Sequence, residues 1–168
     1  MSKRESGVHV FGAITDTTSE AAMKHAKMYY EEVRHFTTDV GKIASNTGFT
    51  YEQILMVKHY LFIDKHVLEK GKPPRCFDEC FEIAESWRRL FGKKKEIKEH
   101  DVLLIKHELK EMELIAQGLS QEEAHRETNK LYNYTEASDA YYYSIGMGVQ
   151  DNSIISGAIR RVLDKNTH

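Results

Sequence analysis

The chain has 168 residues, of which 40% are hydrophobic and 30% charged, a composition typical of one globular domain with a sizeable core. The formal net charge of −2 excludes a global positive field of the kind that recruits nucleic acid. Two cysteines, Cys76 and Cys80, are too few for a disulfide framework and favour a reduced, cytoplasmic setting. We expect no signal peptide and no membrane-spanning segment, so export would need an external secretion or phage system.

We expect an N-terminal arm at residues 1–17, and the residue patterns that predict helices begin after it. A first helix is predicted over residues 21–44, because its apolar residues recur every three to four positions behind a Thr or Ser cap. Gly48 then breaks the chain. Thr50, with Gln53 three residues later, has the spacing of a capping box and starts a helix that runs into the sixties.

The second half of the chain continues this pattern. Gly118 stands where a left-handed residue ends a helix, and Ser120 with Glu123 forms another capping box. The predicted elements are, in order, a loop at 71–75, helices at 77–91, 97–117 and 120–131, an aromatic segment at 132–143, a hinge at 144–148 and an amphipathic helix at 153–164.

These elements predict an all-α fold, a single compact domain of about five to seven helices with an N-terminal arm and an amphipathic C-terminal tail helix. We divide the chain into an arm at 1–17, a helical domain at 18–143, and a hinge with tail at 144–168. The apolar face of the tail, at 153–164, suits a protein partner or self-association.

Four side chains that can carry chemistry gather around the turn at Gly118. His107 and Glu111 lie one helical turn apart and share a face, and Glu108 follows His107 directly. The turn folds the next helix back as an αα-hairpin, so His125 can approach His107.

Three interpretations of these residues stay open. Zinc could be held by His107, Glu111 and His125, with Glu108 or a water performing acid–base work. A metal-free hydrolase could use one histidine as base and the other as acid. Alternatively, His107 and Glu111 form a buried polar pair that only ties helices together. The zinc interpretation is weakened because Glu111 stands where the usual zinc helix has a second histidine.

Other residues are candidates for binding phosphate. Lys58 and His66 lie on one predicted helix, and a lysine beside a histidine can bind a phosphate and move a proton. Arg75 precedes a predicted helix N-terminus, which favours anions, and Arg89 belongs to a basic patch at a helix end. The simpler interpretation is a half-buried histidine and solvated basic side chains.

The order of these segments is similar to that of a known family. The matching stretches are NTGF at 46–49, ILMVKHYLF at 54–62 with a later histidine, FD at 77–78, IAESWRRL at 83–90, DVLLIKHELKE at 101–111, EAH at 123–125 and YNY at 132–134. Together, over about residues 28–143, they resemble a small α-helical domain at the C-terminus of bacterial polymorphic toxins and of phage minor head (head morphogenesis) proteins.

The resemblance implies a delivered effector domain, most often a nuclease. By position, the residues that match the family's motifs are Lys58, His66, Phe77, Asp78, Trp87, Arg89, Asp101, His107, Glu108, Glu111, His125 and Tyr132. Cys80 departs from the family, which usually has an acidic residue there, so a metal ligand at that position is absent.

We therefore expect a toxin-like effector domain that hydrolyses nucleic acid by His/Glu acid–base chemistry. The expected catalytic residues are His107, Glu108, Glu111, His125 and His66, and the expected substrate-binding residues are Lys58, Arg75 and Arg89. The alternatives are a zinc-dependent hydrolase or peptidase, and a non-enzymatic phage structural or partner-binding module.

Overall fold

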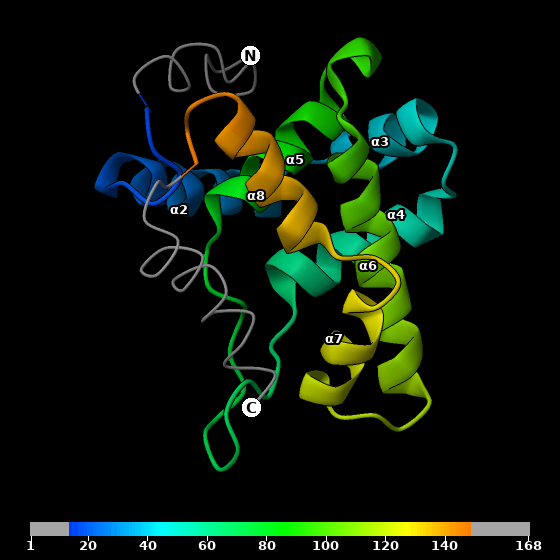
Figure 1. Cartoon of the computed structure of the whole chain (residues 1–168). Helices are drawn as coiled ribbons and strands as arrows, with labels where there is room; N and C mark the ends of the chain where they lie inside the picture. Colours follow the sequence, from blue (N-terminus) through cyan, green and yellow to red (C-terminus); the bar gives the residue numbers. More distant parts are fainter. Residues whose placement is uncertain (1–13, 149–168) are drawn as a thin grey trace.

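The computed structural model describes residues 14–148, and within them the fold is all-α, as the sequence predicts (Figure 1). The α-helices are α2 (Glu20–His35), α3 (Asp39–Thr47), α4 (Tyr51–Lys58), α5 (Phe81–Phe91), α6 (Glu99–Ala116), α7 (Gln121–Asn129) and α8 (Tyr134–Ser144). A π-helix, η1 (His59–Ile63), continues α4, and a short 3-10 helix, η2 (Lys94–Glu96), precedes α6. The N-terminal arm up to residue 13 and the predicted tail helix at 153–164 lie outside the described residues.

The prediction of one helix over residues 21–44 is wrong, because the chain leaves the helix at Phe36. The Phe36 backbone is extended, with φ −66° and ψ 139°, and its carbonyl oxygen accepts a 2.8 Å hydrogen bond from Lys58 Nζ. A buried ammonium group needs oxygen acceptors, and here it takes a carbonyl at the helix end. The new helix, α3, starts at Asp39 and places that carboxylate in the core.

Helix α5 forms the centre of the molecule, because side chains on all of its faces are buried. It packs against α2, α3 and α6, and Trp87, the only tryptophan in the chain, is fully buried. The predicted start of this helix is four residues early, since α5 begins at Phe81. Asp78 accepts a hydrogen bond from Arg75 before the helix starts.

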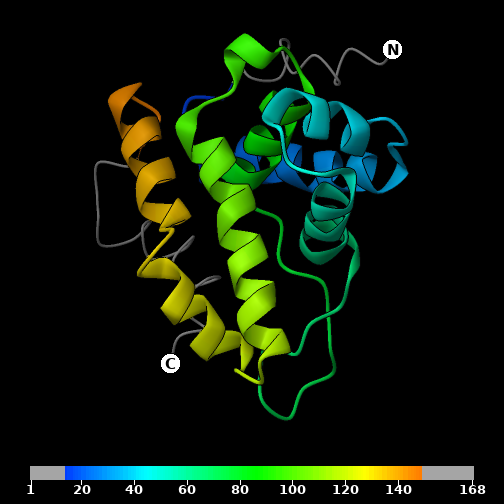
Figure 2. The ribbon, with the colours of Figure 1, turned by 90° about the vertical axis from the view of Figure 1, so that its right-hand side faces the viewer.

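Helix α6 is the long axis on which the other C-terminal helices are arranged. Figure 2 shows α7 and α8 along one side of α6 and α4 along the other, in agreement with the packing contacts. The predicted hairpin is confirmed: Gly118 adopts a φ of 105°, and α7 returns along α6. Leu119 N donates to Leu114 O at 3.1 Å, which closes the end of α6. No helix among the described residues combines the length and apolar character needed to cross a bilayer.

The wide turn η1 sets the direction of the side chains that follow α4. Asp64 N donates to His59 O at 2.7 Å, the five-residue step of a π-helix. Tyr60, Leu61 and Phe62 are consecutive and all buried. Phe62 packs on Trp87 in the core, whereas Tyr60 points toward α6 and α7.

Both predicted capping boxes are present, and one offers a test of helix stability. Thr50 Oγ1 accepts from Gln53 N at 3.1 Å, and Gln53 Oε1 accepts from Thr50 N at 2.9 Å. We expect Thr50→Ala to lower the free energy of unfolding by about 1 kcal/mol in urea denaturation. Thr38 is the matched control, because it precedes α3 without a side-chain cap bond. An equal loss in Thr38→Ala would contradict the assignment.

Candidate functional site

The predicted hairpin brings His107, Glu111 and His125 together. Helix α6 supplies His107 and Glu111, and α7 supplies His125. Glu111 Oε2 lies 3.1 Å from His107 Nε2 and 2.8 Å from His125 Nδ1. All three side chains are buried, with at most 4% of each residue exposed. Among the residues that the structure describes, they are the one group of three or more His, Cys, Asp or Glu residues whose donor atoms converge, all within 4.8 Å of one another.

The outer nitrogens of both imidazole rings are also engaged. Tyr132 O can only accept, so His107 Nδ1 donates to it, at 2.7 Å. On the other ring, His125 Nε2 accepts from the Asn129 side-chain amide at 3.1 Å. All four ring nitrogens therefore have partners, and both rings are fixed in orientation.

Two further residues contact the carboxylate that the histidines share. The Tyr60 hydroxyl donates to Glu111 Oε1, and the Gln121 amide contacts both Glu111 Oε1 and the Tyr60 hydroxyl, the latter at 2.6 Å. Sequence reasoning missed both residues. The Tyr60 side chain reaches Glu111 from the π-helix, which no periodic pattern signals, and Gln121 lies directly after a cap, where polar residues are common.

The pKa values of these groups follow from burial and from the shared carboxylate. Burial opposes the charge on Glu111, but hydrogen bonds from His107 and His125 outweigh it and lower its pKa to about 2. Burial likewise opposes a charged His107, yet Glu111 and Glu108 raise its pKa to about 9. Burial raises the pKa of Glu108 to about 8. The shifts at Glu111 and His107 both favour a proton shared between His107 and the charged Glu111 carboxylate, and an ion bound at His107 Nε2 would release that proton.

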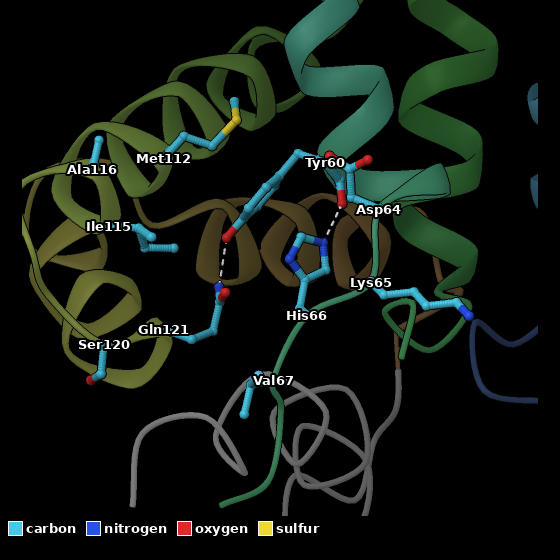
Figure 3. Close-up of a pocket in the computed structure, with 10 residues that line it drawn as sticks. All are labelled: Tyr60, Asp64, Lys65, His66, Val67, Met112, Ile115, Ala116, Ser120 and Gln121. Atoms are coloured by element: carbon cyan, nitrogen blue, oxygen red, sulfur yellow. Dashed lines mark hydrogen bonds between the residues drawn. The ribbon is translucent and has the colours of Figure 1, made fainter. Parts of the chain in front are cut away.

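A pocket of about 800 Å³ lies beside the cluster, between residues 64–67 and the α6–α7 turn (Figure 3). Tyr60 and Gln121 form its inner end, and the hydrogen bond between them is drawn in Figure 3. Because these two residues also contact Glu111, the pocket ends one side chain away from the cluster.

His66 and Glu108 lie next to the cluster without joining the three converging donors. His66 lines the pocket, bonds to Tyr60 O at 2.7 Å and stacks on Phe77 with ring centroids 4.2 Å apart. Glu108 is buried, and its carboxylate contributes to the raised pKa values of Tyr60 and His107.

The three expected phosphate-binding residues do not gather at the site. Each has an acidic partner elsewhere: Lys58 pairs with Asp39 at 2.9 Å, Arg89 with Asp101 at 2.8 Å, and Arg75 with Asp78 at 2.6 Å. Lys58 and Arg89 are also buried, and their pairs connect helices of the core.

Fold and site together define an all-α protein with a buried His–Glu–His cluster beside a pocket. Comparison with models of protein families, with curated proteins and with solved structures gives no match. The resemblance to the toxin and phage-head domain therefore stays a prediction.

Proposed function

We propose that the protein is a metal-dependent hydrolase whose ion is held by His107 Nε2, Glu111 Oε2 and His125 Nδ1. The observation that carries the proposal is the convergence of these three buried donor atoms beside a pocket. Two imidazole nitrogens and a carboxylate oxygen are a donor set that catalytic zinc uses, with a fourth position left for water or substrate.

The spacing of the donor atoms supports a metal of this size. With Zn–N and Zn–O bonds of about 2.0–2.1 Å, the edge of a tetrahedron is about 3.3 Å. The carboxylate oxygen of Glu111 lies 3.1 and 2.8 Å from the two nitrogens. The two nitrogens lie within 4.8 Å of each other, so the two rings would move toward a shared ion on binding it.

The groups behind the two rings also support a metal site. Metal-binding histidines usually donate their other N–H to a carbonyl or carboxylate, and His107 Nδ1 does so to Tyr132 O. With a metal on Nδ1, His125 Nε2 would carry the proton and need an acceptor. Asn129 Oδ1 is buried and has no hydrogen-bond partner among the described residues, and turning the amide over would bring this oxygen to Nε2.

Metal-free acid–base chemistry, the leading expectation from sequence, fits these contacts less well. A general base needs a ring nitrogen that can reach the substrate, and all four nitrogens are engaged within the cluster. A bound zinc would instead polarise the substrate and lower the pKa of a bound water to about 7. Tyr60 is placed to hydrogen-bond a substrate, because its hydroxyl lies where the pocket meets Glu111.

Elemental analysis of the full chain, purified without chelator, tests the proposal. We expect about one zinc per chain, and a loss of zinc affinity on the order of 100-fold in His125→Ala. Asn129→Ala, which leaves all three donors in place, should weaken zinc binding by about 10-fold or more. His35→Ala is the control, because His35 is an exposed histidine at the end of α2 and is not one of the converging donors.

Less than about half a zinc per chain, with no binding when zinc is added, would overturn the proposal. Bound iron would also overturn it, because the same donor set on iron serves oxygen chemistry. Unchanged affinity in both His125→Ala and Asn129→Ala would place the zinc elsewhere. Thermal melting of each variant separates loss of the site from loss of the fold.

A further inference from the structure

The wall of the pocket beside the cluster is mainly apolar. Met112, Ile115 and Ala116 of the last turns of α6 line one side, and Val67 lines the opposite segment (Figure 3). Polar side chains also line the rim and the segment at 64–66, and at the inner end Tyr60 and Gln121 present polar groups next to Glu111. Such a pocket accepts an apolar group and positions a polar group at its inner end.

The charges around the pocket do not favour a polyanion. Among the described residues that line it, Lys65 is the one lysine or arginine, and Asp64 precedes it directly. In Figure 3 the Lys65 side chain extends away from Tyr60 and His66. Proteins that bind nucleic acid bring several cations to the phosphates, and Lys58 and Arg89 are paired in the core instead.

We infer that the pocket takes the apolar side chain of a peptide, and that the substrate is a peptide amide. This inference rests on the proposed metal-dependent hydrolysis. Water supplies the oxygen that bonds to the carbonyl carbon, the C–N bond breaks, and the released amine takes the proton. The substrate carbonyl accepts from the Tyr60 hydroxyl once that hydroxyl turns its proton away from Glu111 Oε1, where the Gln121 amide still donates.

Amino acid hydroxamates are suitable probes, because they bind zinc through one group and carry a variable side chain. The test is titration calorimetry of leucine hydroxamate and of acetohydroxamate on the zinc-loaded full chain. Leucine hydroxamate is expected to bind at least about 10-fold more tightly, since the pocket buries its isobutyl group. Ala116→Trp, which fills the pocket from an exposed helix position, is expected to remove that preference. The same substitution at exposed Ala140, on α8, is the matched control.

Each other outcome has a defined meaning. Equal affinity for the two hydroxamates, or a preference that survives Ala116→Trp, overturns the peptide inference and leaves the metal site standing. Cleavage or tighter binding of a single-stranded oligonucleotide by the zinc-loaded chain overturns it in favour of nucleic acid. Failure to load zinc removes the proposed function, and the peptide inference with it.

Discussion

Replacing Asp39 with alanine is expected to lower the free energy of unfolding by about 3–5 kcal/mol. Asp39 is fully buried, and its two oxygens accept from Lys58 Nζ at 2.9 Å and from Trp87 Nε1 at 3.1 Å. Without the carboxylate, the Lys58 ammonium stays in the core with only Phe36 O as a partner. An uncompensated buried charge costs far more than the lost hydrogen bonds.

Urea denaturation of matched variants measures this effect. The control is Asp78→Ala, which removes the exposed ion pair with Arg75 and should cost less than about 1 kcal/mol. Adding Lys58→Met to Asp39→Ala should recover part of the loss, because it removes the unpaired charge and keeps the volume. Equal losses in Asp39→Ala and Asp78→Ala would show that the buried pair does not hold α3, α4 and α5 together.

The carboxyl of Glu82 is expected to contribute stability at low pH that is lost as pH rises between about 4.5 and 8. Burial raises the Glu82 pKa from 4.5 to about 8, and the neighbouring Asp139 carboxyl adds to the shift. Between these values the folded chain binds a proton that the unfolded chain has released. The Glu82 contribution to stability is therefore lost progressively through this window, on the order of 1 kcal/mol per pH unit, and the loss is complete above about pH 8.

The variant Glu82→Gln isolates this contribution. Its amide stays neutral and can donate to Asp139, so the variant should lack the Glu82 part of the slope and be more stable than the parent at pH 8. Thermal unfolding from pH 4.5 to 8.5 gives the difference between the two proteins, in which other titrating groups cancel. Glu52→Gln, at an exposed position of α4, should follow the parent. A parent and a Glu82→Gln variant with parallel pH profiles would contradict the expectation.

The helical class, the capping boxes and the hairpin could be predicted because each depends on neighbouring residues. Gly118 and the Ser120–Glu123 pair specify the turn locally, and that turn is sufficient to bring His125 to His107 and Glu111. The convergence of the three donors was therefore visible in the sequence as a possibility. The burial of the three side chains, and the partners of the outer ring nitrogens, could not be predicted from the sequence.

The features that sequence patterns missed depend on contacts between distant residues. Phe36 ends α2 because its carbonyl meets Lys58, 22 positions later. Tyr60 and Glu111 meet across 51 positions, through a π-helix that has no sequence period of its own. Contact between distant residues also explains why Arg89, expected in a basic patch, is paired in the core. It meets Asp101 because α5 packs on α6.

Because η1 is a π-helix, the site depends on the number of residues in this turn as well as on which residues they are. Tyr60 and Phe62 are two positions apart, yet one contacts Glu111 and the other packs on Trp87. A π-helix holds about one residue more than the corresponding α-helical turn, and each residue changes the direction of the side chains by about 100°. A chain shorter by one residue at this point could satisfy the core or the cluster, but not both. Insertions and deletions should therefore be tolerated in the loop at 68–74 and excluded from residues 59–63.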